Sequence, residues 1–179
     1  IIFILLLFFS LSLIGQTEKN NSFDIVFTEL MIDPTPIVGL PAYEYIEIYN
    51  RSNKDINLLD WTIQIGNNTK TIPDTIIKAN EYLTITDLSN YDGFLKYGKV
   101  LPIQSLASLN NEAQTIKLID NNGEIIDIVS YKADWYNDKI KADGGWALEK
   151  KDPDYFCCDT NNWSASISYI GGTPCQANS

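Results

Sequence analysis

Apolar and polar side chains alternate in two neighbouring segments of the chain. Within Tyr43–Tyr49, Ile46 and Ile48 occupy every second position, which is the pattern of a strand with one buried face. A polar break follows, and apolar residues then recur at every second position over Leu59–Ile65. This run predicts another strand with Trp61 on its buried face. We therefore expect the Trp61 ring in the core and not on a sugar-binding surface.

Other segments also have the length and composition of strands, and turn residues separate them at intervals typical of a sandwich. With the two above, the predicted strands are Ile25–Met31, Tyr43–Tyr49, Leu59–Ile65, Thr75–Ile77, Tyr82–Thr86, Thr115–Ile119, Ile125–Ser130 and Trp146–Glu149. Asp120–Gly123 predicts a hairpin with a type I′ turn, because Asn-Gly tolerates positive φ angles. Asp87–Ser108 lacks a period, so we expect a long crossover with a short strand near Lys99–Pro102. No segment predicts a helix.

Two motifs follow one another in the first half of the chain. Glu44–Asn50 reads E-Y-I-E-I-Y-N, and a Leu-x-x-Trp motif ends at Trp61; in this order they resemble the lamin tail domain. The closing elements that also resemble this family are Gly145–Glu149, Asn162–Ser166 and Gly171–Pro174. The resemblance runs over residues 24–178 and implies an all-β, immunoglobulin-like β-sandwich of the kind found in exported bacterial proteins. The chain departs from the family at Cys175, where Gly is usual.

The first residues, Ile1–Ile14, are almost purely apolar and uncharged, and the chain turns polar directly after Gly15. This pattern predicts a secretory signal peptide over residues 1–15, without its basic n-region, and a single domain over residues 16–179. The alternative is a membrane anchor, but about 14 residues are short for a span of roughly 20. We expect a secreted or cell-surface protein with no stable membrane span after cleavage.

Charge and composition exclude several function classes. The net charge of −10 opposes binding to a phosphate backbone, so no nucleic-acid partner is expected. The sequence contains no His, which excludes a Ser-His-Asp triad and every His-containing zinc site.

A glycosidase needs only two carboxylates, which leaves carboxylate pairs to consider. Glu44 and Glu47 point to opposite faces of their predicted strand, so they do not form such a pair. Glu29 and Glu47 lie on different strands and can approach each other. We expect both to be structural, as acceptors for backbone amides or as solvated charges, and we predict no enzyme activity.

Carboxylate-rich segments suit calcium better than zinc, because hard cations prefer oxygen ligands. One group of candidate ligands is Glu29, Asp33 and Glu47. A second group is Asp152, Asp154 and Asp159. Neither group has the spacing of an EF-hand. Calcium is therefore a hypothesis for a cofactor, with the first group as its ligands.

Three cysteines in an exported chain predict one disulfide and one remaining thiol. Cys157 and Cys158 are adjacent, and a bond between neighbours requires a strained ring. Cys175 is therefore expected to pair with one of them, and we favour Cys158 over Cys157. The bridge would contribute about 3 kcal/mol on the chain-entropy model.

Trp135 and Tyr136 lie in a polar stretch, followed by Gly144 and Gly145. The sequence as a whole leaves three classes of function open. The first is a non-catalytic module for binding, adhesion or scaffolding at the cell surface, with a protein or glycan partner. The second is a carbohydrate-binding module with exposed Trp135 and Tyr136 as its platform. The third is an enzyme that uses carboxylates alone. The alternative role of Trp135 and Tyr136 is to hold the C-terminal tail against the edge of the sandwich.

Overall fold

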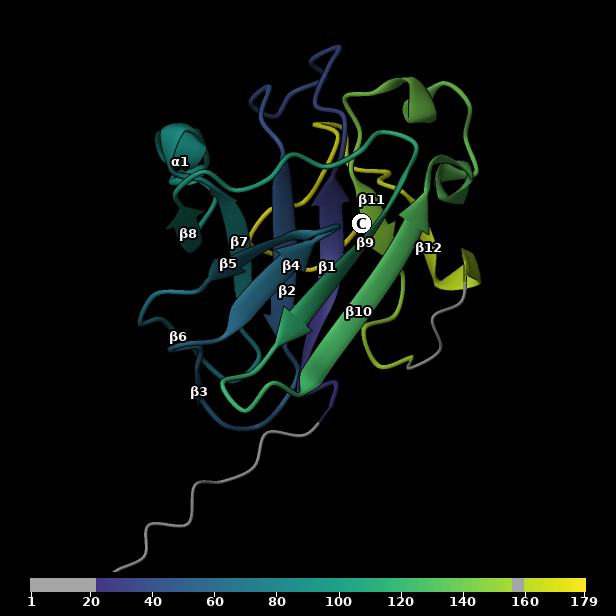
Figure 1. Ribbon diagram of the computed structural model, residues 1–179. Helices are drawn as coiled ribbons and strands as arrows, with labels where there is room; N and C mark the ends of the chain where they lie inside the picture. Colours follow the sequence, from purple (N-terminus) through teal and green to yellow (C-terminus); the bar gives the residue numbers. More distant parts are fainter. Residues whose placement is uncertain (1–21, 156–159) are drawn as a thin grey trace, which may run out of the picture.

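Two stacked β-sheets form the structure, a computed structural model that describes residues 22–155 and 160–179 (Figure 1). The larger sheet contains, in spatial order, β12 (Trp163–Ala165), β11 (Leu148–Lys150), β1 (Ile25–Met31), β2 (Tyr45–Asn50), β7 (Tyr82–Asp87) and β8 (Val100–Ile103). Neighbouring strands run antiparallel, except that β7 and β8 are parallel.

The smaller sheet contains, in spatial order, β10 (Ile125–Lys132), β9 (Ala113–Ile119), β4 (Thr62–Ile65) and β5 (Asn68–Thr71), with all neighbours antiparallel. A separate antiparallel pair consists of β3 (Ile56–Asn57) and β6 (Ile76–Ile77). In Figure 1 the smaller sheet lies in front of the larger one, so that each presents one face to the other. The predicted all-β sandwich is confirmed.

Short helical turns join the strands. They are η1 (Leu88–Asn90), α1 (Tyr91–Phe94), η2 (Ala133–Tyr136), η3 (Lys141–Asp143) and η4 (Thr160–Asn162). The expectation of no helix is wrong at α1. The Asp87 side chain accepts the Ser89 N–H at 2.9 Å and so caps the turn that leads into α1, a local signal that apolar periodicity does not contain. No helix in the described ranges is long and apolar enough to cross a membrane.

The strand predictions hold in position and differ at their ends. Leu59 does not belong to β4, because Asp60 has a φ of +63° and the Trp61 N–H donates to Leu58 O at 3.0 Å. This turn leaves Leu59 45% exposed, so the prediction that it shares the buried face with Trp61 is wrong.

The hairpin between β9 and β10 is confirmed, but its predicted turn type is wrong. A type I′ turn needs positive φ at both central residues, whereas here Gly123 has a φ of +84° and Asn122 is not among the residues with positive φ. The Asp120 side chain accepts the N–H groups of Asn122 and Glu124, at 2.9 and 2.8 Å. These bonds stabilise a longer turn.

The main core lies between the two sheets. Trp61 is 1% exposed and packs with Ile63 from the smaller sheet and with Phe27 and Ile48 from the larger one. This burial confirms the prediction for Trp61.

The outer face of the larger sheet carries a second apolar cluster. Its members are Met31, Leu40, Tyr45, Phe94 and Ala147. The rings of Tyr45 and Phe94 meet edge to face with centroids 5.1 Å apart, so the segment before β2 and α1 both pack on this face. The cluster covers one end of the face, and the candidate site lies beside it.

Candidate functional site

Three glutamates lie side by side on the outer face of the larger sheet. Glu29 on β1 is the register partner of Glu149 on β11 and of Glu47 on β2. Glu47 alternates with Ile46 and Ile48, which belong to the core, so its side chain points to the opposite face. The exposed fractions of Glu149, Glu29 and Glu47 are 4%, 0% and 0%. These residues form what we call the glutamate row.

The C-terminal tail (residues 171–179) lies over the glutamate row. The Thr173 N–H donates to Glu29 Oε1 at 2.8 Å, and the Thr173 hydroxyl donates to Glu149 Oε1 at 2.9 Å. The Tyr45 hydroxyl also donates to Glu29 Oε1, at 2.9 Å. The tail approaches so closely that a Cβ at Gly172 would lie 2.6 Å from both Glu29 Oε1 and the Tyr45 hydroxyl. Glycine is therefore the residue that this approach requires.

The two outer members of the row hold the rest of the tail. Glu47 Oε2 accepts the Cys175 N–H at 2.5 Å, and Glu47 Oε1 accepts the Thr28 hydroxyl at 2.9 Å. Glu149 Oε2 accepts the N–H and the hydroxyl of Ser179, at 2.9 and 2.8 Å. Each glutamate of the row thus accepts one backbone N–H from the tail. The predicted role of Glu29 and Glu47 as acceptors for backbone amides matches this geometry.

Burial dominates the electrostatics of the row. Loss of solvent, followed by the nearby Glu149 carboxyl, raises the pKa of Glu29 to about 8, although hydrogen bonds from Thr173 and Tyr45 oppose the shift. Burial, followed by the charge of Glu29, raises the pKa of Glu47 well above its ordinary value. Glu29 and Glu47 therefore favour the protonated form at neutral pH.

The predicted calcium ligands do not come together. Glu29 and Glu47 are neighbours, but the Asp33 carboxylate accepts instead from the Thr35 N–H at 3.1 Å and from Asn111 Nδ2 at 2.7 Å. Asp33 follows the end of β1 and leaves the sheet with the next loop. In residues 22–155 and 160–179, no three His, Cys, Asp or Glu side chains are grouped to hold a metal ion.

The second group of aspartates has other roles where the structure describes it. Asp154 pairs with Arg51 over 2.8 Å, and the Asp152 side chain accepts the Asp154 N–H at 2.8 Å. Asp159 lies outside the described residues.

The Cys175 thiol is free in the structure. Its Sγ lies 3.2 Å from Thr84 Oγ1 and donates to Lys99 O at 3.2 Å. Thr84 is the register partner of Glu47, so the bond from the Cys175 N–H to Glu47 places the thiol beside β7. Burial raises the pKa of this thiol.

The predicted disulfide between Cys158 and Cys175 is therefore wrong at Cys175, and Cys157 and Cys158 lie outside the described residues. Cys175 has a φ of +66°, a left-handed conformation that favours glycine. A Gly at this position, which the resemblance implied, would adopt this conformation without strain. The contacts of the thiol with Thr84 on β7 and with Lys99 O offset part of the free-energy cost of this left-handed conformation.

Trp135 and Tyr136 are buried, with 6% and 5% exposure, so the predicted exposed platform is wrong. The polar neighbours of Trp135 suggested exposure, but η2 turns the ring inward, where its centroid lies 6.3 Å from that of Trp163. The Tyr136 hydroxyl donates to Trp146 O at 3.1 Å. Both rings join the segments around Trp146 and Trp163 to the sandwich. The alternative interpretation assigned them the C-terminal tail, which the glutamate row holds instead.

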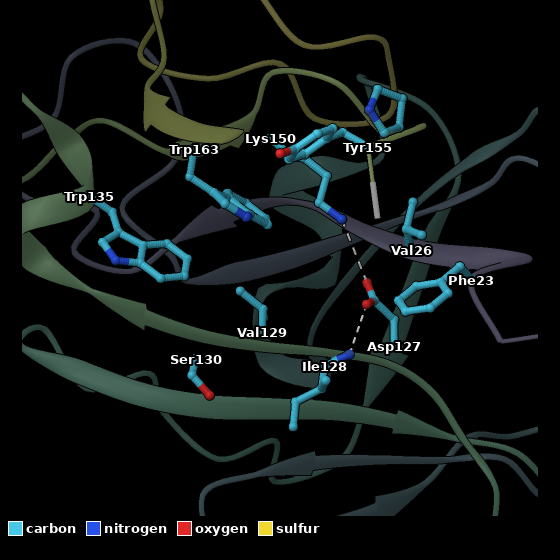
Figure 2. Close-up of a pocket in the computed structure, with 11 residues that line it drawn as sticks. Phe23, Val26, Asp127, Ile128, Val129, Ser130, Trp135, Lys150, Tyr155 and Trp163 are labelled. Atoms are coloured by element: carbon cyan, nitrogen blue, oxygen red, sulfur yellow. Dashed lines mark hydrogen bonds and ion pairs between the residues drawn. The ribbon is translucent and has the colours of Figure 1, made fainter. Parts of the chain in front are cut away.

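Figure 2 shows the small cavity that Trp135 lines together with Trp163, Lys150 and Asp127. Its volume of about 20 Å³ suits a single water molecule, and a sugar ring is much larger. Lys150 Nζ lies 3.9 Å from Asp127 Oδ2. This cavity is therefore not a carbohydrate site.

Sequence reasoning missed several residues that complete the glutamate row. They are Thr28, Tyr45, Glu149, Thr173 and Ser179. Glu149 was assigned to a strand, but its neighbour in the sheet was unknown. The family motif around Gly171–Pro174 was the one signal that this tail has a fixed position.

Comparison with protein families gives one result that agrees with this architecture. The model of the lamin tail domain family matches residues 18–133, which include β1 to β10. The later strands β11 and β12 and the tail lie beyond the match. β11 and β12 complete the same larger sheet, and the tail lies over its outer face. A search of curated proteins found no match.

Proposed function

The chain belongs to the lamin tail domain family, which is immunoglobulin-like, and on that premise we propose that it is an exported, non-catalytic module for binding, adhesion or scaffolding at the cell surface. The observation that carries the proposal is the use of the glutamate row. Two of its members, Glu29 and Glu47, have strongly raised pKa values, which is a mark of catalytic acids. Here they accept N–H groups of the chain's own tail and are closed to solvent.

General acid catalysis requires a titratable group within reach of a substrate. The glutamate row does not meet this condition, and the sequence has no His to replace it. A stable sandwich with loops at its ends is instead the usual framework of a binding module. The net charge of −10 favours protein or glycan partners over nucleic acid.

Export rests on the apolar, uncharged run Ile1–Ile14 and the polar residues after Gly15. These residues lie outside the described part of the chain. Expression with a Met and a basic n-region placed before Ile1 should yield a secreted product that begins near Gln16, as mass spectrometry of its N-terminus would show. A membrane-bound product that keeps this run would instead identify an anchor.

Assays of the purified chain on sugar, ester, peptide and nucleic-acid substrates test the absence of catalysis. We expect no turnover, with or without divalent cations. Glu47→Gln serves as a matched variant, because its amide oxygen still accepts the Cys175 N–H. Reproducible turnover by the wild-type chain that Glu47→Gln abolishes would overturn the proposal.

A further inference from the structure

A cleft of about 330 Å³ lies between three segments: the loop before β2, the turn η1 after β7 and the segment after β8. Figure 1 shows these segments at the end of the sandwich that carries α1. The lining residues that matter here are Tyr43, Glu44, Asp87, Ser89, Asn90 and Ser108. We call it the Tyr43 cleft. Its volume lies at the lower end of the range for small-molecule sites.

Hydrogen bonds between the three segments hold the Tyr43 cleft in shape. Glu44 Oε2 accepts the Leu109 N–H at 2.8 Å, which ties the loop before β2 to the segment after β8. Asp87 Oδ2 accepts the Leu106 N–H at 2.9 Å and ties η1 to that same segment. Since hydrogen bonds to two partly exposed carboxylates fix both walls, a ligand would meet a preformed site.

Several polar groups in the Tyr43 cleft have no partner among the residues that the structure describes. They are Glu44 Oε1, an acceptor; Asn90 Nδ2, a donor; and the hydroxyls of Ser108 and Tyr43. Acceptors, donors and hydroxyls within one cleft match the hydroxyl groups of a polyol.

Tyr43 adds an aromatic surface to these polar groups. It is 42% exposed, and α1 supports it, because a Cβ at Gly93 would lie 3.3 Å from the ring atoms Cδ2 and Cε2. A large aromatic side chain that is supported by its neighbours and partly exposed is suited to stacking against a flat apolar surface. The C–H face of a sugar ring is such a surface.

The charge of the cleft narrows the class of ligand further. Glu44 and Asp87 are acidic, and no Lys or Arg lines the cleft, which disfavours anionic ligands. We propose that the Tyr43 cleft binds one sugar unit of a neutral glycan, with its ring against Tyr43 and its hydroxyls on Glu44 and Asn90. This inference rests on the proposed function and assigns its ligand class and site.

Hydrolysis is the competing function for this cleft, because the pKa values of its two carboxyl groups are shifted in opposite directions, as in an acid–base pair. Burial raises the pKa of Glu44, whereas hydrogen bonds from Ser89 lower that of Asp87. Both oxygens of Asp87 already serve the fold, since Oδ1 accepts the N–H and hydroxyl of Ser89 and Oδ2 accepts the Leu106 N–H. Binding without bond cleavage is therefore the function that the geometry favours.

Titration of the full chain with cellohexaose, mannohexaose and chitohexaose, followed by amide NMR, tests the proposal. At least one hexasaccharide should shift the amide signals of Tyr43, Ser89 and Asn90. Tyr43→Ala should raise the Kd at least about tenfold, whereas Tyr43→Phe should change it by less than about threefold because the ring remains. Tyr169→Ala is the matched control: Tyr169 is 89% exposed and does not line the cleft, so binding should not change.

Each of three results would overturn the inference: no binding of any hexasaccharide at millimolar concentration, the same Kd for Tyr43→Ala as for the wild type, or shifts confined to residues away from the cleft. Binding of a lysine hexapeptide at these amides, without sugar binding, would identify a cationic ligand and also overturn it. These outcomes leave the proposed non-catalytic function intact. Cleavage of a hexasaccharide that Glu44→Gln abolishes would overturn both.

Discussion

The Thr173 hydroxyl reaches Glu149 Oε1 at 2.9 Å, while the Thr173 backbone N–H reaches Glu29 Oε1 at 2.8 Å, 144 residues earlier in the chain. One residue of the tail therefore bridges two carboxyl groups that are register partners on neighbouring strands. Carboxyl groups so close repel each other when both are charged. The position of the tail and the protonation of Glu29 are for this reason linked.

The stability of the domain should fall as the pH rises. Burial and Glu149 raise the pKa of Glu29 from 4.5 to about 8, and the pKa of Glu47 shifts in the same direction. A carboxyl group whose pKa is raised by folding stabilises the fold while it is protonated, and this contribution is lost between its unfolded and folded pKa values. The free energy of unfolding should decrease by at least about 1.4 kcal/mol between about pH 4.5 and about pH 8. Urea denaturation across this range measures it.

Glu29→Gln should flatten this pH dependence, because the amide oxygen still accepts the Thr173 N–H but the side chain does not titrate. Glu124→Gln, an exposed position on the turn between β9 and β10, is the control and should leave the slope unchanged. Equal slopes in the wild type and Glu29→Gln would show that Glu29 does not drive the effect.

Trp61→Ala and Trp135→Ala should each lower the free energy of unfolding by about 3–5 kcal/mol, since the residues are 1% and 6% exposed. Trp135→Phe should cost much less, about 1 kcal/mol, because the buried Trp135 Nε1 has no hydrogen-bond partner in the described structure. Chemical denaturation would measure all three. A loss below about 0.5 kcal/mol for Trp135→Ala, the range of a surface substitution, would contradict the burial of this ring.

Two substitutions at Cys175 measure separately the free-energy cost of its left-handed backbone and the stabilisation from its thiol contacts. Cys175→Ala removes the contacts with Thr84 and Lys99 O and keeps the φ of +66°, so it should destabilise the domain by about 1 kcal/mol. Cys175→Gly relieves the left-handed conformation and should be more stable than Cys175→Ala by about 1 kcal/mol. Thermal unfolding of both variants compares them. The reverse order would mean that the backbone is not strained at this residue.

Gly172→Ala should loosen the tail. The added Cβ would lie 2.6 Å from Glu29 Oε1 and from the Tyr45 hydroxyl, so the tail must shift, at a cost of about 1–3 kcal/mol. Gly93→Ala is the comparison, because its Cβ would first meet an atom at 3.3 Å. Hydrogen exchange at the Thr173 and Cys175 amides should accelerate in Gly172→Ala alone. Unchanged protection there would contradict the close packing of the tail.

Alternating apolar residues were sufficient to predict most strands, because burial of one face is a local property of the sequence. The polar strand β5 was missed: Asn68–Thr71 contains no apolar residue and becomes a strand only by pairing with β4. Tyr43 was assigned to the strand that begins at Tyr45. Tyr43 lies instead in the loop before β2 and lines the cleft. This loop has no regular alternation of apolar residues from which its course could be predicted.

The candidate site was predictable only in part for a related reason. Glu29 and Glu47 were expected to approach each other, because their strands were recognised. Glu149 joins them because β11 lies next to β1, and strand order across a sheet is set by the tertiary fold. Trp135 shows the opposite error, since polar sequence neighbours indicate nothing about which way a short helical turn directs its ring.

The borders of the larger sheet bear on how copies of this domain behave when crowded. On one side β8 contains Pro102, which has no N–H to donate to an added strand. On the other side β12 has three residues, too short a template for extended pairing. Both borders resist strand addition from a neighbouring molecule, so the larger sheet does not readily extend from one copy to the next in a dense array.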